Sequence, residues 1–181
     1  QRVLKYLRDT RGRGIRLKPG TTGIVASGHF DAAYGVHPDG KSHTGACIMI
    51  GDAGPVLAES CRQQIVTKSS TEAELVALSD STNQLLHLRR FLIAQGHPQD
   101  PATIYQDNMS CMALQDKGRS TSKRTRHINI RYFWTKEQCD NGEIAIVHRA
   151  TELMGAANVM TKPTQGNQFQ NERHQLTNFA G

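Results

Sequence analysis

The sequence lacks any long hydrophobic run. None of its apolar stretches approaches the roughly 18 residues that a membrane-spanning helix needs. The first twenty residues carry seven Lys and Arg and have no apolar core of the kind found in a secretory signal peptide. Repeats and low-complexity blocks are also missing. We therefore expect a soluble, intracellular domain with no membrane partner, or a piece cut from a longer chain.

Paired cysteines are absent as well. The 4 cysteines stand far apart, with no C-x-x-C pair and no histidine at zinc-finger spacing. This pattern indicates neither a structural zinc site nor a disulfide framework, and we expect ordinary unpaired thiols.

Acidic residues are scarce in two basic stretches. The chain has 22 Lys and Arg against 16 Asp and Glu, and residues 1–18 and 117–136 each hold seven of these basic residues. The second stretch contains no acid. This concentration favours a polyanion partner such as nucleic acid, although basic runs can also form a solvated surface.

The pattern of apolar residues predicts strands first and helices later. Residues 24–34 alternate as a strand does, and strand-like runs over 43–50 and 55–63 flank the turn at 51–54. From Ser69 the period changes to about 3.6 and predicts a long helix that ends near Gly96. Beyond it we predict further elements in the order strand, short helix, helix, strand and helix, at 102–106, after Asp107, 128–139, 143–148 and 153–160.

This order of elements predicts an α/β fold with a five-stranded mixed sheet, in which three antiparallel strands are followed by two more and helices pack on the sheet. We divide the chain into a basic helix and linker at 1–20, the main domain at 21–163, and a polar tail at 164–181 with at most a short helix.

Three acidic residues fall where this fold could use them. Asp31 lies near the end of the first strand and Asp107 follows the strand at 102–106, at the edge where α/β sheets collect ligands. Glu74 shares a helix face with Leu78 and Leu85, so it should point inward. Converging carboxylates favour a divalent cation. The simpler alternatives are a turn role for Asp31, a capping box with Thr71 for Glu74 and a helix cap for Asp107.

Several motifs carry a resemblance to a known family. The sequence resembles the ribonuclease H domain of Ty1/copia-type LTR retrotransposon polyproteins over residues 1–178. The motifs that carry it are Phe30-Asp31-Ala32, Lys41-Ser42-x-Thr44-Gly45, SSTEAE at 69–74, Asp107-Asn108, RTRHINIR at 124–131 and Thr161-Lys162-Pro163. Residues 1–18 are similar to the stretch that leaves the reverse transcriptase in such polyproteins.

The resemblance implies a ribonuclease H-like fold and hydrolysis of the RNA strand of an RNA–DNA hybrid with two Mg²⁺ ions, for which Mn²⁺ can substitute. It implies that Asp31 bridges both ions and that Glu74 and Asp107 hold the ion nearer the leaving group. The fourth acidic position of the family, which helps to hold the water-activating ion, is occupied here by Asn158. Asn158 completes the expected catalytic and metal-binding set, but its neutral oxygen is a weaker ligand for that ion than a carboxylate.

The resemblance also suggests which residues contact nucleic acid. The basic segment would follow phosphates, polar groups beside the sheet would meet 2′-hydroxyls, and His127 would either contact a phosphate or pack in a helix. The expected contacts are Ser70, Thr71, Asn108, Lys117, Arg119, Lys123, Arg124, Arg126 and His127. The expected partners are a hybrid and an upstream reverse transcriptase, in a cytoplasmic virus-like particle. Two alternatives stay open: a weakened, connection-type module that only binds hybrid, and an integrase-like core, which the SSTEAE helix disfavours.

Overall fold

The computed structural model describes residues 1–18, 20–109 and 126–178, with the side chains of 126–129 left out of that description. The short helix predicted after Asp107 and the basic loop before residue 126 lie outside the described residues. None of the described helices is both long enough and apolar enough to cross a membrane.

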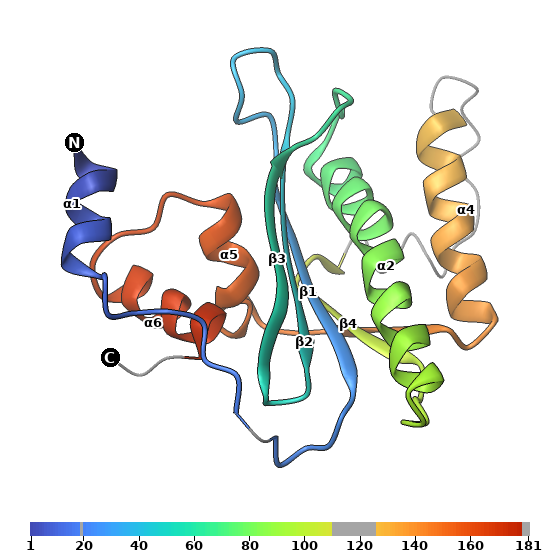
Figure 1. The fold of residues 1–181 in the computed structure, drawn as a ribbon. Coiled ribbons are helices and arrows are strands. Elements are labelled where there is room, and N and C mark those ends of the chain that lie inside the picture. Colours follow the sequence, from blue (N-terminus) through green and yellow to red (C-terminus); the bar gives the residue numbers. More distant parts are fainter. Residues whose placement is uncertain (19, 110–125, 179–181) are drawn as a thin grey trace.

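A mixed sheet forms the centre of the fold, as predicted (Figure 1). Its strand order is β3-β2-β1-β4-β5. The first three strands pair antiparallel, whereas β4 pairs parallel to both β1 and β5. The strands are β1 (Ala26–Ala33), β2 (His43–Ile50), β3 (Gly54–Arg62), β4 (Ala102–Gln106) and β5 (Ile144–His148).

Two helices, α2 (Ser70–Ala94) and α4 (Arg126–Asp140), cover one face of the sheet (Figure 1). The α2 helix begins where the sequence predicts, because the Ser69 side chain accepts a hydrogen bond from the Glu72 backbone N–H. Its apolar side packs on β1, β2 and β4, and the core between them contains Phe30, Ile48, Leu78, Leu85 and Ile104. This packing fixes the position of the first turns of α2 over the sheet.

The other face carries the C-terminal helices (Figure 1). The helix predicted at 153–160 is instead a 3₁₀ turn, η2 (Thr151–Leu153), followed by α5 (Gly155–Thr161). The tail forms a full helix, α6 (Gly166–Thr177), which packs on α5. The N-terminal helix α1 (Arg2–Asp9) buries none of its residues, and Tyr6 meets the Phe169 ring edge-on.

A glycine in β2 sets how closely α5 approaches the sheet. Gly45 pairs with Asp31 across the β1–β2 ladder. A Cβ atom at Gly45 would lie 2.7 Å from the Ala157 carbonyl oxygen and 2.6 Å from Thr161 Cγ2. Because those distances are shorter than van der Waals contact, any larger residue would push α5 away. The absence of a side chain at Gly45 therefore lets the C-terminal end of α5 lie directly over Asp31.

Candidate metal centre

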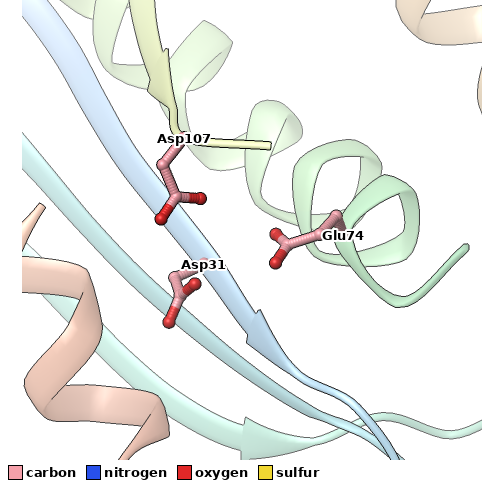
Figure 2. Close-up of side chains that lie close together, drawn as sticks. All are labelled: Asp31, Glu74 and Asp107. Atoms are coloured by element: carbon pink, nitrogen blue, oxygen red, sulfur yellow. The ribbon is translucent and has the colours of Figure 1, made fainter. Parts of the chain in front are cut away.

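Three carboxylates converge at one edge of the sheet (Figure 2). Asp31 lies within β1 and Asp107 directly follows β4, and these strands run parallel. Parallel strands end at the same edge of a sheet, so the two aspartates meet there. Glu74 reaches them from the second turn of α2. One ligand oxygen from each residue lies within 4.8 Å of the others.

Glu74 faces this cluster and does not cap the helix. Its side chain is buried, whereas Glu72 caps the start of the helix: its Oε2 accepts from the Lys68 backbone N–H at 2.7 Å, and its own backbone N–H donates to the Ser69 side chain at 3.2 Å. The capping-box alternative for Glu74 with Thr71 is therefore wrong. The two glutamates stand on different sides of α2 because residues two apart differ by about 200° around a helix axis.

A buried glutamine holds the cluster together. Gln106, the last residue of β4, donates from Nε2 to Glu74 Oε2 at 3.3 Å. Its Oε1 accepts from the backbone N–H groups of Asp107 at 2.8 Å and Asn108 at 3.2 Å. This one side chain thus joins the end of β4 to α2 and fixes the turn that presents Asp107. On the opposite side, the Thr151 hydroxyl donates to Asp107 Oδ2 at 2.9 Å.

The cluster is electrostatically strained without a cation. Burial, followed by the charges of Asp31 and Asp107, raises the pKa of Glu74 to about 8. Burial also raises the pKa of Asp31, although the Thr161 hydroxyl and the Lys162 ammonium oppose that shift. Among the described residues, no Lys or Arg forms an ion pair with Glu74 or Asp107. Three hard oxygen donors at this spacing fit a divalent cation of the Mg²⁺ or Mn²⁺ type.

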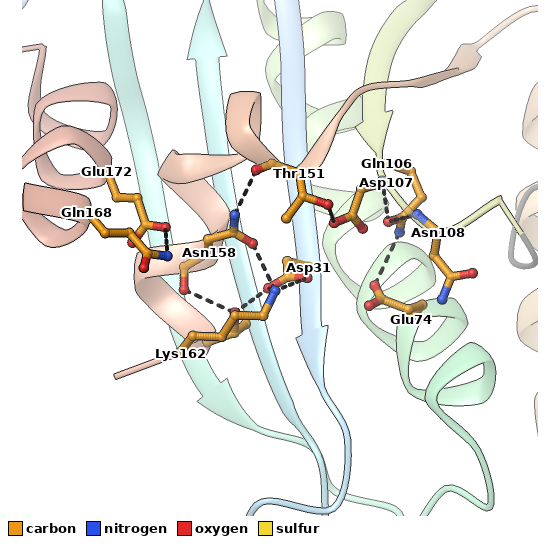
Figure 3. Close-up of polar contacts among 11 residues, drawn as sticks. Asp31, Glu74, Gln106, Asp107, Asn108, Thr151, Asn158, Lys162, Gln168 and Glu172 are labelled. Carbon is orange, nitrogen blue, oxygen red and sulfur yellow. Dashed lines mark hydrogen bonds and ion pairs between the residues drawn. The ribbon is translucent and has the colours of Figure 1, made fainter. Parts of the chain in front are cut away.

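The structure places Asn158 on α5, beside Asp31 and away from Glu74 (Figure 3). Its side chain is buried, and its Nδ2 donates to the Thr151 carbonyl at 2.9 Å. Its Oδ1 accepts from Lys162 Nζ at 3.0 Å. The fourth predicted site residue therefore reaches the centre through a lysine.

The predicted nucleic-acid contacts are placed in part. Ser70 and Thr71 form the first turn of α2, exposed and half-buried respectively, one turn before Glu74. Asn108 follows Asp107 at the same edge. Four of the remaining candidates lie outside the described residues: Lys117, Arg119, Lys123 and Arg124. For Arg126 and His127, at the start of α4, only the backbone is described.

Four contacting residues were not predicted as site residues: Gln106, Thr151, Thr161 and Lys162. Thr161 Oγ1 donates to Asp31 Oδ2 and also to the Asn158 carbonyl. A signal for two of them exists in the sequence, because Thr161 and Lys162 follow Asn158 by three and four residues and so share its helix face.

Comparison with solved structures shows the fold class of the chain. The chain has a ribonuclease H-like fold. It superposes on the ribonuclease H1 LC11, isolated from compost by a metagenomic approach, with a TM-score of 0.57 and 13% identity, over 76% of this chain and 92% of that one. The same enzyme in complex with an RNA/DNA hybrid gives a TM-score of 0.51 and 11% identity, over 75% and 92% of the two chains. No protein-family model matches the chain.

Comparison with curated proteins confirms the resemblance predicted from the motifs. The chain is homologous to part of the Pol polyproteins of plant Ty1/copia-type transposons. It is 28% identical over 168 residues to the Pol polyprotein of transposon TNT 1-94 from Nicotiana tabacum, and 30% identical over 172 residues to that of transposon RE1 from Arabidopsis thaliana. These matches cover 93% and 94% of this chain but only 12% of each polyprotein.

Proposed function

We propose that this chain is a retrotransposon ribonuclease H that cleaves the RNA strand of RNA–DNA hybrids with the help of Mg²⁺. The observation that carries the proposal is the cluster of Asp31, Glu74 and Asp107 within 4.8 Å, in a ribonuclease H-like fold. Homology to Pol polyproteins supports a role in reverse transcription, next to an upstream reverse transcriptase. We propose the same cytoplasmic setting that the resemblance implies.

The residues at the sheet edge that carries the three carboxylates have different roles in this proposal. A divalent cation held there would lower the pKa of an attacking water or neutralise charge on the leaving oxygen of the cut strand. Asp31, Glu74 and Asp107 would hold the cation, and Gln106 and Thr151 keep two of those carboxylates in place. Ser70, Thr71 and Asn108 stand beside the cluster, where the 2′-hydroxyls of the RNA strand would pass. The basic residues at 117–126, with His127, would follow the phosphates.

One observation favours a second function. Asn158 supplies no charge where the family has an acid, so the chain could bind hybrid and cleave it weakly. Hybrid binding itself depends mainly on the basic surface and would survive this change.

The two functions are separated by a cleavage assay. The substrate is a hybrid labelled on its RNA strand, with RNA duplex and DNA duplex as comparisons, each with Mg²⁺ and with EDTA. We expect cleavage of the hybrid alone, dependent on Mg²⁺ and lost in Glu74→Gln. Glu72→Gln is the matched control, because it makes the same change on the other side of α2, and a glutamine oxygen can still accept from the Lys68 backbone N–H. Hybrid binding without cleavage in Mg²⁺ or Mn²⁺ would assign the second function.

A further inference from the structure

One ammonium group occupies the flank of Asp31 that faces α5 (Figure 3). Lys162 Nζ lies 3.2 Å from Asp31 Oδ2, 3.4 Å from Asp31 Oδ1 and 3.0 Å from Asn158 Oδ1. Three oxygens from two residues thus surround a single positive charge. The Asp31 side chain is 2% exposed and that of Lys162 is 42% exposed, so a partly exposed lysine pairs with a buried carboxylate.

The orientation of Asn158 is set by the backbone behind it. A side-chain amide has a donor end and an acceptor end. Because its Nδ2 donates to the Thr151 carbonyl at 2.9 Å, its Oδ1 must point at Lys162. An aspartate in the same position would put an anionic oxygen against that carbonyl. Asn158 therefore suits this arrangement as a neutral ligand for the ammonium.

The local backbone brings Lys162 to this place. It directly follows α5, and its own N–H donates to the Asn158 carbonyl at 2.9 Å. A positive charge is favoured at the C-terminal end of a helix. Pro163 holds the preceding residue extended, as observed for Lys162 at φ −121° and ψ 137°. Gly45 allows this end of α5 to lie close to Asp31.

The balance of charge indicates what this lysine does. The three carboxylates carry three negative charges when ionised, which one divalent ion and the ammonium together neutralise. Two divalent ions beside the ammonium would bring five positive charges, and Asn158 adds no negative charge to meet them. An acid in place of Asn158 would bring the total to four negative charges, enough for two divalent ions once the ammonium is removed.

We infer that the Lys162 ammonium holds the second cation position between Asp31 and Asn158, so that this chain binds a single divalent ion, in the three-carboxylate cluster. The inference rests on the proposed function in one respect, namely that the cluster binds a divalent cation. Lys162 is then a built-in monovalent substitute for the second ion, and Asn158 is its ligand.

The number of bound Mn²⁺ ions tests this inference without an activity measurement. Free Mn²⁺ is counted by electron paramagnetic resonance during a titration at millimolar Mn²⁺. We use Mn²⁺ because it binds mixed ligands more tightly than Mg²⁺ does. We expect one ion in the wild-type chain and two in the double variant Asn158→Asp, Lys162→Met. The matched control is Asn141→Asp, Lys136→Met at the far end of α4, where Lys136 pairs with Asp140, and it should bind one ion.

The outcomes separate this inference from the proposed function. Two ions in the wild-type chain, which requires no variant, would overturn the inference and leave the proposed function standing. A folded double variant that still binds one ion would also overturn it. A wild-type chain that binds no Mn²⁺ would contradict both the inference and the metal site of the proposed function.

Discussion

The two flanks of Asp31 are built from opposite kinds of chemistry. Toward α2 it faces Glu74 and Asp107, two carboxylates without a cationic partner among the described residues. Toward α5 it faces an amide and an ammonium from Asn158 and Lys162 (Figure 3). The acidic flank requires a cation from solution, whereas the α5 flank has a cation of its own.

The flanks also differ in how the fold holds them. The acidic flank lies on β1, β4 and the start of α2, whose packing forms the main hydrophobic core. The α5 flank depends on a seven-residue helix that contacts the sheet at Gly45. Substitutions on the acidic flank should therefore alter metal binding directly, while those on the α5 flank should alter it through the charge beside Asp31 and through the position of one short helix.

The largest expected effect is on the acidic flank. Replacing Asp31 or Asp107 by Asn, or Glu74 by Gln, should lower Mg²⁺-dependent hybrid cleavage by at least about 100-fold, because each change removes a ligand of the cation. Mn²⁺ titration should show a matching loss of affinity. Cleavage near the wild-type rate in any of the three variants would remove that residue from the site.

The next largest effect tests the α5 flank. The double variant Asn158→Asp, Lys162→Met should raise cleavage in Mg²⁺ by about tenfold or more, because an aspartate offers charge to a second cation where asparagine offers a neutral oxygen, and the ammonium no longer occupies that position. The metal-free variant should also melt at a lower temperature, since its carboxylate faces the Thr151 carbonyl. Asn141→Asp, Lys136→Met is the matched control. If this double variant cleaves no faster than the wild-type chain at saturating Mg²⁺, residue 158 does not occupy the fourth ligand position.

The third prediction concerns the close contact between Gly45 and α5, which brings the two flanks together. Gly45→Ala should lower the free energy of unfolding by about 1–3 kcal/mol, the usual cost of overpacking, because its Cβ would overlap α5. Urea unfolding measures this loss. Gly14→Ala is the control, since a Cβ there meets nothing within 4 Å. Equal effects of the two substitutions would show that the close approach of α5 is not required.

Much of the acidic flank could be predicted from local patterns. Alternation placed β1 and β2, the capping residues placed the start of α2, and helix geometry turned Glu74 inward. Asp31 and Asp107 follow from the rule that parallel strands end at one edge. These signals lie within a few residues of the side chains that they position.

The α5 flank could not be predicted in the same way. The Lys162 contact with Asp31 spans 131 residues of sequence and depends on the missing side chain at Gly45. The length of α6 was also missed, because its apolar stripe is thin and its partners are distant. The Arg16 backbone N–H donates to the Thr177 carbonyl at 2.8 Å, and a Cβ at Gly155 would touch Gln175.

The pH dependence of stability provides the fourth prediction and reports on the acidic flank without metal. The pKa of Glu74 is raised from 4.5 to about 8 in the folded chain. Between these values the folded chain holds a proton that the unfolded chain has lost, so the free energy of unfolding must fall as pH rises. Glu74→Gln should remove at least about 1 kcal/mol of that fall in EDTA. Glu72→Gln should leave it in place.

The smallest expected effect distinguishes Lys162 from the basic segment. Neutralising Lys123, Arg124 and Arg126 together should weaken hybrid binding about equally for all sequences and flatten its salt dependence by roughly two to three units of slope, since each lost phosphate contact removes about 0.9. Lys162→Met should leave the slope close to wild type, because Asp31 already neutralises that ammonium and no phosphate counterion is released there. Binding is measured by fluorescence anisotropy over a series of salt concentrations, with Arg90→Gln as control, about 24 Å along α2 from Glu74. If Lys162→Met flattens the salt dependence of binding by a full unit of slope, this lysine contacts a phosphate. If the triple change leaves the slope unaltered, the basic segment forms a solvated surface instead.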